Sequence, residues 1–262
     1  MINKRLMRIK FFFGCNIFKT LVFNIRLLPL REALHLPILI FGKADVSLCK
    51  GKIEWIKGKR PAFGSWTFGR INQFHINQAP LLSVYAIENI LRLGDRGEIG
   101  NGSSLLVLRK GILSIGSHAR ISDNVKIKCY EEICIGDNTG ISWESQIFDT
   151  NFHYMLSSDR IVKPINKAVR IGSHCWIGNR VTIMKGTLLP DGAIVASNSF
   201  VNKSFSDSYR PLVAGSPALL IRQGDMAIFD FTIQAKLNNF FLNTQQHEYV
   251  LSDEEMAQIM NR

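Results

Sequence analysis

The sequence is poor in the residues that crosslink small secreted proteins and build zinc sites. Its 262 residues include only five cysteines, an odd number without the paired spacing of a disulfide framework or a zinc site. We therefore expect free thiols and a reducing compartment. Charged residues make up 20% and hydrophobic residues 46% of the chain. This composition excludes predominant disorder, a collagen-like chain and a coiled coil.

The N-terminal part of the chain lacks the uninterrupted apolar run that a membrane span or a signal peptide needs. Lys19 and Arg26 interrupt the apolar residues of positions 6–30, so the stretch falls short of the roughly 20 continuous apolar residues of a spanning helix. Only four residues separate Lys10 from Cys15, whereas a signal peptide has an apolar core of roughly 7–15 residues. We expect neither a span nor cleavage and export.

Acidic residues are scarce where basic residues concentrate. Residues 1–70 hold 14 lysines and arginines but three acidic residues, so the formal net charge of +11 belongs to this segment alone. Such a local basic excess favours an anionic surface as partner. Apolar residues recur at helical spacing within it, at Leu6, Ile9, Phe13, Ile17 and Leu21.

Residues 1–30 therefore have two open interpretations. They form a basic amphipathic helix that lies on a membrane surface, or a helix that packs on the protein's own body or on an oligomer interface. A nucleic-acid-binding arm is disfavoured, because the residues between the charges are bulky and apolar.

A six-residue repeat is the strongest signal in the chain. Aliphatic residues recur every six positions at Ile171, Ile177, Ile183, Leu189, Val195 and Val201. The same spacing holds earlier at Ile115, Ile121 and Ile127, and after a two-residue insertion it resumes at Ile135, Ile141 and Ile147. The position four residues after each is usually small or compact, as at Ala119, Val125, Thr139, Ser145, Cys175, Val181, Thr187, Ala193 and Ser199. A weaker set at Leu93, Ile99 and Leu105 begins the pattern. A period of six fits neither a helix nor a simple strand, and it predicts a solenoid of triangular coils with short strands on three faces.

The repeat resembles that of the hexapeptide-repeat acyltransferases over residues 93–222, and two motifs carry the likeness. The stretch IGSHCWIGNRVTI at 171–183 is similar to the nucleotide-sugar and polysaccharide branch of that family. VAGSPA at 213–218, followed by Arg222, is similar to the segment that closes the solenoid in acetyl-CoA-dependent members. The resemblance implies an all-β solenoid, a left-handed parallel β-helix, and a homotrimer with each active site shared between subunits.

The repeat stops between Ile147 and Val169, which predicts a loop that leaves the solenoid over residues 148–168. The loop begins FDTNFHYM, and the family carries its catalytic histidine in a closely similar segment. The resemblance therefore assigns His153 as the general base that takes a proton from a sugar hydroxyl. Asp149 or Asn151 would orient its imidazole, although Asn151 stands where the family has a second aspartate.

The resemblance also implies contacts to acetyl-CoA, which would be the acyl donor. Gly178, Ala196 and Ser197 would line the channel of the pantetheine arm, and Trp176 would supply an apolar face. Lys203 and Arg222 would bind the CoA phosphates. Two departures stand out: Leu219 replaces a common lysine, and the connection from Lys203 to Val213 is longer than usual.

The remaining histidines and Cys175 are expected to be structural. His118 and His174 occupy equivalent slots of the repeat, three residues after an aliphatic position, and so are expected in turns. No closely spaced histidine pair is present, so we expect no metal site. Cys175 falls in an inward slot and is expected in the core.

The other segments are accessory. Residues 31–92 are expected to build irregular first coils, and 223–262 a helical extension. In that extension, residues 226–243 and 252–262 are expected to be helical, the second with a capping box of Ser252 and Glu255.

The resulting hypothesis is an O-acetyltransferase that acts on a sugar hydroxyl of a bacterial surface polysaccharide or its lipid-linked precursor. We expect it in the cytoplasm, peripheral on the inner face of the membrane, with no nucleic acid as partner. An antibiotic O-acetyltransferase and a non-catalytic scaffold remain as alternatives. The sequence does not specify the sugar, the hydroxyl or the acyl group.

Overall fold

The computed structural model describes residues 14–58, 60–71 and 81–260. The chain divides into two compact units, Met1–Asp225 and Met226–Arg262.

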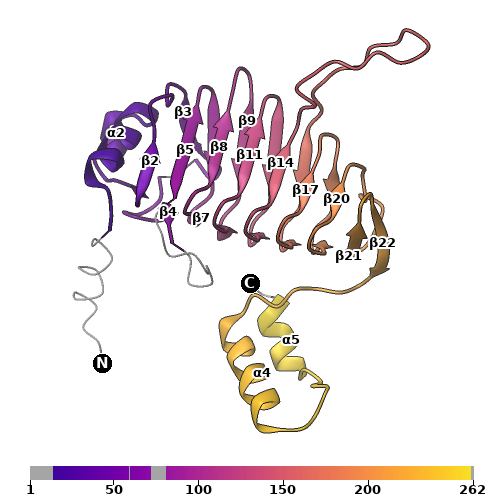
Figure 1. The fold of residues 1–262 in the computed structure, drawn as a ribbon. Coiled ribbons are helices and arrows are strands. Elements are labelled where there is room, and N and C mark those ends of the chain that lie inside the picture. The colour runs from indigo at the N-terminus through magenta and orange to yellow at the C-terminus, as the bar shows by residue number, and fades with distance from the viewer. Residues whose placement is uncertain (1–13, 59, 72–80, 261–262) are drawn as a thin grey trace. The chain divides into compact units, whose positions relative to one another are not determined.

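The first unit is a solenoid in which successive strands belong to three different sheets in turn, so that each sheet forms one face (Figure 1). The first face contains β1 (Ile38–Ile40), β4 (Trp66–Arg70), β7 (Gly97–Gly100), β10 (Ala119–Ile121), β13 (Gly140–Ile141), β16 (Trp176–Ile177), β19 (Ile194–Val195), β21 (Pro211–Gly215) and β22 (Ala218–Gln223). The second face contains β2 (Lys43–Asp45), β5 (Leu82–Ile87), β8 (Ser104–Val107), β11 (Lys126–Cys129), β14 (Gln146–Phe148), β17 (Thr182–Ile183) and β20 (Phe200–Val201). The third face contains β3 (Lys52–Trp55), β6 (Ile90–Leu93), β9 (Ile112–Ile115), β12 (Glu132–Ile135), β15 (Val169–Ile171) and β18 (Leu188–Leu189).

The six-residue repeat builds the core as predicted. Successive strands pair in parallel so that Ile121, Ile141, Ile177 and Val195 form one column of the first face, and each of these side chains is buried. The compact positions four residues later are buried as well. Fully burying one such aliphatic side chain contributes roughly 1.5–3 kcal/mol. The predicted fold class, a left-handed parallel β-helix, is confirmed.

The turns explain which residues follow the aliphatic position. Three residues after it the backbone is left-handed, with φ between 54° and 61° at His118, Asn124, Asn138, Glu144, His174, Arg180 and Asn198. Gly186 and Gly192 occupy the same slot with φ of 78° and 72°. Glycine and asparagine tolerate this region best, and the two histidines are turn residues, as predicted.

The stacked coils start earlier than the repeat in the sequence indicates. Within residues 31–92, β1 pairs with β4, β2 with β5 and β3 with β6, all in parallel. Longer connections at 46–51 and 56–65 separate these strands, which is why the six-residue period is hidden in this part of the sequence.

A helix, α2 (Ile17–Leu27), covers the open edge of β1. The side chain of Thr20 accepts a hydrogen bond from Ile40 N (2.9 Å), and the Asn24 amide donates to Ile38 O (2.7 Å). The backbone N–H of Asn16 donates to Ile40 O. An exposed strand edge would otherwise invite pairing with another chain. A short helix, α3 (Leu30–Ala33), follows.

The two sides of α2 differ in burial, which bears on the two interpretations of residues 1–30. Phe23 and Leu27 are buried, so this side packs on the protein's own body. The other side leaves apolar residues exposed, namely Ile17, Phe18, Leu21 and Ile25. Leu6, Ile9 and Phe13 of the predicted stripe lie outside the described residues. No helix in the described ranges is long and apolar enough to cross a membrane.

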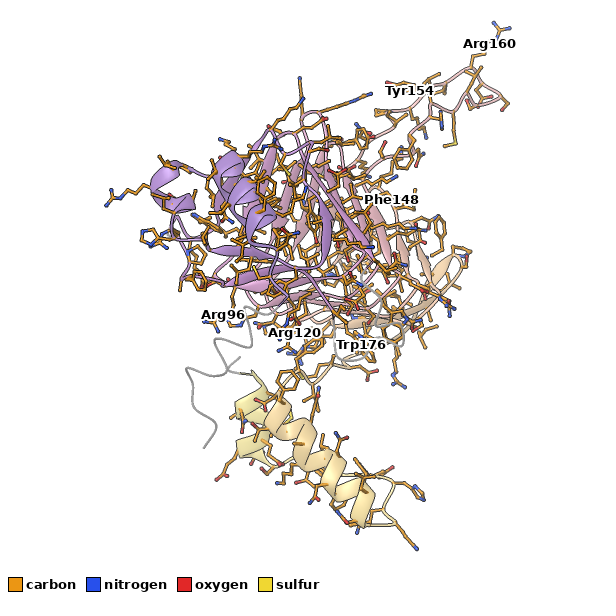
Figure 2. All side chains as sticks on the ribbon, turned by 60° about the vertical axis from the view of Figure 1, so that its left-hand side comes forward. Arg96, Arg120, Phe148, Tyr154, Arg160 and Trp176 are labelled. Carbon is orange, nitrogen blue, oxygen red and sulfur yellow. The ribbon has the colours of Figure 1, made fainter. Side chains whose placement is uncertain are left out.

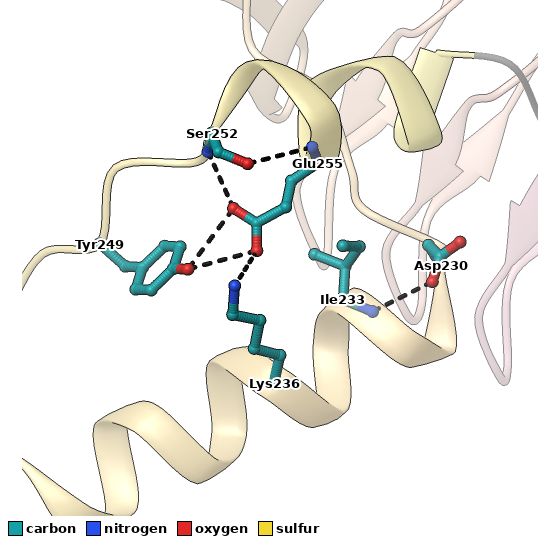
Figure 3. Close-up of polar contacts among 6 residues, drawn as sticks. All are labelled: Asp230, Ile233, Lys236, Tyr249, Ser252 and Glu255. Carbon is teal, nitrogen blue, oxygen red and sulfur yellow. Dashed lines mark hydrogen bonds and ion pairs between the residues drawn. The ribbon is translucent and has the colours of Figure 1, made fainter.

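The second unit is a pair of helices, α4 (Phe231–Asn243) and α5 (Asp253–Met260), held by a polar cluster (Figure 3). The predicted capping box is confirmed: Ser252 N donates to the Glu255 carboxylate, and Glu255 N donates to Ser252 Oγ. Glu255 also accepts from Lys236 Nζ at 2.6 Å. The start expected at residue 226 is wrong, because Asp230 caps α4 by accepting from Thr232 N and Ile233 N.

Candidate active site

The hairpin of residues 149–168 leaves the solenoid between β14 and β15, where the repeat predicts an excursion (Figure 1). It departs from the edge between the second and third faces, which we call the loop edge. Its two arms join through bridges between Thr150 and Asn166 and between Leu156 and Val162. Asn151 N also donates to Ile165 O at 2.9 Å. The base of the hairpin is therefore tied on both arms.

His153 lies on the first arm of this hairpin and is exposed. Its backbone N–H donates to Asn151 O at 2.7 Å in a tight turn. Its imidazole forms no hydrogen bond or ion pair with any residue in the described part of the chain. The ring is thus open to a substrate or to another subunit.

The carboxylate of Asp149 binds backbone groups and not the imidazole of His153. Its buried carboxylate accepts hydrogen bonds from Tyr130 N (2.9 Å) and Glu131 N (2.7 Å), two backbone groups of the coil below. Its own carbonyl accepts from Lys167 N at 2.9 Å. Asp149 therefore anchors the start of the hairpin on the solenoid, which differs from the direct orientation of His153 expected from the sequence. Asn151 contributes backbone bonds to the turn that presents His153.

The sequence does not predict the aromatic group to which Phe152, the neighbour of His153, belongs. Phe152 packs edge-to-face on Phe148 (centroids 5.6 Å apart) and on Tyr130 (6.0 Å). The Lys128 ammonium lies 5.2 Å from the Phe152 ring centroid. Phe148 and Phe152 precede the histidine closely in the sequence, but Tyr130 and Lys128 come from the preceding coil, more than twenty residues earlier. Spacing along the loop does not reveal them.

Four of the residues expected to contact acetyl-CoA gather at another edge, between the first and second faces, which we call the Trp176 edge. Trp176 pairs with Ile194 in adjacent coils, and Gly178 N donates to Val195 O. Ala196 and Ser197 lie in the turn of the next coil. The indole of Trp176 is 46% exposed and its Nε1 donates to Ser142 Oγ at 3.4 Å. This edge therefore offers an aromatic face beside small residues.

Gly178 keeps two coils in close contact. A Cβ at this position would lie 2.7 Å from Ser197 N and 2.8 Å from Val195 O. Any side chain would push the turn of Ala196 and Ser197 away. The glycine thus allows adjacent coils to approach closely beside the expected pantetheine channel.

Lys203 and Arg222 do not join these four residues in one cluster. Lys203 follows β20 at the loop edge, with its ammonium 5.3 Å from the centroid of the Phe205 ring. Arg222 lies in β22 on the first face and pairs with Asp225.

Within one chain, the histidine and the Trp176 edge are apart. His153 projects from the loop edge, whereas Trp176 belongs to the first face. Figure 2 shows Trp176 well away from the hairpin that carries Tyr154 and Arg160.

Cys175 and His118 lie in environments that favour their neutral forms. Burial raises the pKa of the Cys175 thiol to about 12, so it is a neutral core residue, as expected. Burial also lowers the pKa of His118. Across the described residues, no group of three or more His, Cys, Asp or Glu side chains is placed to hold a metal ion.

Known proteins with related sequences point to one family. No model of a protein family matches the chain. WbbJ of Escherichia coli strain K12, assigned as a lipopolysaccharide biosynthesis O-acetyltransferase, is 28% identical over 51% of this chain and 71% of its own. WcaF of the same strain, assigned as a colanic acid biosynthesis acetyltransferase, is 28% identical over 42% of this chain, which spans 58% of WcaF. An uncharacterized 24.8 kDa protein in the cps region of Klebsiella pneumoniae is 30% identical over 71% of this chain and 82% of its own.

The three-faced parallel solenoid and these relatives together define the class of protein. The chain belongs to the hexapeptide-repeat acyltransferases.

Proposed function

We propose that the protein transfers an acetyl group from acetyl-CoA to a sugar hydroxyl of a bacterial surface polysaccharide or of its lipid-linked precursor. The observation that carries this proposal is the open imidazole of His153, presented on a tied hairpin of an acyltransferase solenoid. The assigned roles of WbbJ and WcaF in polysaccharide biosynthesis support the choice of acceptor.

The chemistry requires one group that accepts and then returns a proton. A sugar hydroxyl is too weakly acidic to ionise near neutral pH, whereas imidazole has a pKa of about 6.5 and serves as a general base. His153 takes the hydroxyl proton while the oxygen attacks the thioester carbonyl carbon. The tetrahedral intermediate then expels the CoA thiolate, which receives that proton from the imidazolium. An O-acetyl ester and free CoA result, with no acyl-enzyme.

Acetyl-CoA binds along the Trp176 edge in this proposal. Its pantetheine arm passes Gly178, Ala196 and Ser197, where adjacent coils approach closely. The arm also contacts the exposed indole of Trp176. Arg222 binds the phosphates together with Lys203, which lies at the loop edge and so comes from the subunit that supplies the hairpin. Arg222 then either leaves its ion pair with Asp225 or binds Asp225 and a phosphate at the same time.

The active site is completed by another subunit, and we expect a homotrimer. His153 and Trp176 lie on different edges of one chain, so the hairpin of one subunit meets the Trp176 edge of the next. Exposed apolar side chains on the hairpin support this arrangement, namely Tyr154, Met155, Leu156, Ile161 and Val162.

The exposed side of α2 rests on an anionic membrane surface in this proposal, which places the enzyme at a lipid-linked acceptor. Ile17, Phe18 and Ile25 are 51–70% exposed, and the positive charge of residues 1–70 surrounds them in sequence. Apolar burial in the interface and attraction to anionic lipid act together in such helices.

The test is the acetyl content of the cell-surface glycan, measured by mass spectrometry. Cells that lack the protein lose O-acetyl groups; the wild type restores them, and His153→Ala does not. His174→Asn, which changes a histidine in a turn slot that asparagine also occupies, restores them and serves as the matched control. Full restoration by His153→Ala contradicts the proposal and favours a scaffold. An unchanged glycan together with acetylation of a hydroxylated antibiotic favours the antibiotic alternative.

A further inference from the structure

A cluster beside His153 combines three aromatic rings with a lysine. Phe148, at the end of β14, and Phe152, in the hairpin, pack edge-to-face, and Tyr130 packs on Phe152. Lys128 Nζ lies 5.8 Å from the Phe148 centroid and 5.2 Å from that of Phe152. We call Lys128, Tyr130, Phe148 and Phe152 the aromatic shelf. Phe152 is the residue immediately before His153 in the chain.

The backbone holds the shelf in place. Lys128 pairs with Phe148 in the register of β11 and β14, so both side chains point outward from the second face. Phe152 has φ of 63°, a region that bulky residues avoid. The Thr150 hydroxyl accepts a hydrogen bond from Phe152 N at 3.1 Å, and Thr150 is buried. A large apolar ring held in a disfavoured backbone conformation beside a histidine points to a function.

The shelf carries a positive charge that has no carboxylate partner among the described residues. Lys128 forms no ion pair with a described residue, and its contacts are the two ring faces. Two carboxylates of the neighbouring coils have other partners: Asp149 accepts from backbone N–H groups, and Glu132 pairs with Arg170. A second cation, Arg109, lies 5.5 Å from the Tyr130 centroid.

Such a surface suits a ring that bears a negative charge. The C–H face of a pyranose packs on aromatic rings as an apolar surface, while an ammonium attracts a carboxylate or phosphate group. Phe152 is 41% exposed, which leaves ring area for this contact.

We propose that the aromatic shelf binds a negatively charged sugar unit of the acceptor, with its ring on Phe152 and its carboxylate or phosphate on Lys128. The inference rests on the proposed role of His153, because the shelf places this unit next to the reacting hydroxyl. Lys128 thereby selects anionic over neutral acceptors.

The experiment measures binding of three probes to the full-length protein by calorimetry. Methyl β-galactoside is neutral, methyl β-galacturonide carries a carboxylate, and galactose 1-phosphate carries a phosphate. We expect at least one anionic probe to bind at least about tenfold more tightly than the neutral probe, and Lys128→Met to reduce this preference to about twofold or less. The probe that shows the preference identifies whether a carboxylate or a phosphate is recognised.

Lys126→Met is the matched control. Lys126 lies two residues earlier in β11 on the same outward face, and no aromatic ring contact to it is present among the described residues. This variant keeps the preference. Equal binding of neutral and anionic probes, no binding of any probe, or a preference that survives Lys128→Met overturns the inference.

Failure of the proposed function gives a different result. Probe binding does not require turnover, so the preference is measured equally well in His153→Ala. Acetyl transfer retained by His153→Ala refutes the role of His153 and leaves the binding result intact. Loss of transfer in that variant, together with equal probe binding, refutes the shelf alone.

Discussion

At the scale of single residues, one buried carboxylate ties the start of the hairpin to the solenoid. Asp149 is fully buried and accepts backbone N–H groups of Tyr130 and Glu131. A buried polar group of this kind is stabilising only while its partners remain. Since His153 follows four residues later, the position of its imidazole depends on this anchor.

We predict that Asp149→Asn destabilises the fold by about 1–3 kcal/mol, because the amide loses a charge-assisted bond and turns a donor toward a backbone N–H. Urea unfolding measures the loss, and hydrogen exchange locates it in residues 149–168. The control is Asp191→Asn: Asp191 is exposed and its carboxylate oxygen accepts a single bond from Ser173 N, so a smaller loss is expected there. Equal losses at the two positions would contradict an anchoring role for Asp149.

At the scale of elements, the two ends of the described chain show how helices are held by polar side chains. Thr20 and Asn24 of α2 satisfy the open edge of β1. In the second unit, Glu255 of α5 joins Lys236 of α4, Tyr249 and Ser252 (Figure 3). The hydrogen bond from Lys236 is the main reason that the pKa of Glu255 falls from 4.5 to about 2.

This shift predicts a pH dependence of the helix pair. Because the pKa of Glu255 is lower in the folded state, its contribution is complete above about pH 4.5 and disappears as the pH falls toward 2. We expect Glu255→Gln to accelerate hydrogen exchange of α4 and α5 by up to about fivefold at pH 6, and to have no effect near pH 2. Both proteins are compared at each pH, so intrinsic exchange rates cancel.

Glu254→Gln removes a charge from the same helical turn but leaves the contact between Lys236 and Glu255, and it is the control. If Glu254→Gln accelerates exchange as much as Glu255→Gln, general helix electrostatics rather than the specific pair explains the effect.

At the scale of the whole molecule, the sequence predicts the solenoid well because each aliphatic residue has the same environment in every coil. Ile121, Ile141 and Ile177 stack in one column, so their period is visible without a structure. In the first coils the connections between strands differ in length, so their sequence shows no six-residue period. The role of Asp149 and the shelf around Lys128 depend on contacts between neighbouring coils, which a six-residue period does not report.

The division of the candidate site between two edges has the same origin. The repeat assigns each residue a phase within a coil, and it identifies His153 as part of an excursion. It does not report whether a second copy of the chain faces the loop. The separation of His153 from Trp176 follows from the order of the three faces, and it is the physical reason to expect a shared active site.

The exposed apolar side of α2 leads to a prediction about membrane binding. We expect the protein to cosediment with vesicles of phosphatidylcholine and phosphatidylglycerol, and much less with phosphatidylcholine alone, because apolar insertion and lysine and arginine charges act together. Phe18→Ser combined with Ile25→Ser should reduce vesicle binding by at least about tenfold, since each buried side chain contributes roughly 1.5–3 kcal/mol. Both residues point away from the β1 contact, as their exposure shows.

Leu242→Ser is the control for this membrane test, because Leu242 is 84% exposed on α4 and is not part of the α2 surface. It should leave cosedimentation unchanged, and raising the salt concentration should weaken binding of the wild type by screening its charges. Binding that is equal for neutral and anionic vesicles, or that survives the double substitution in α2, would remove the membrane from the proposal. A fall in the mass of the oligomer on the same double substitution would instead assign this face to contacts between subunits.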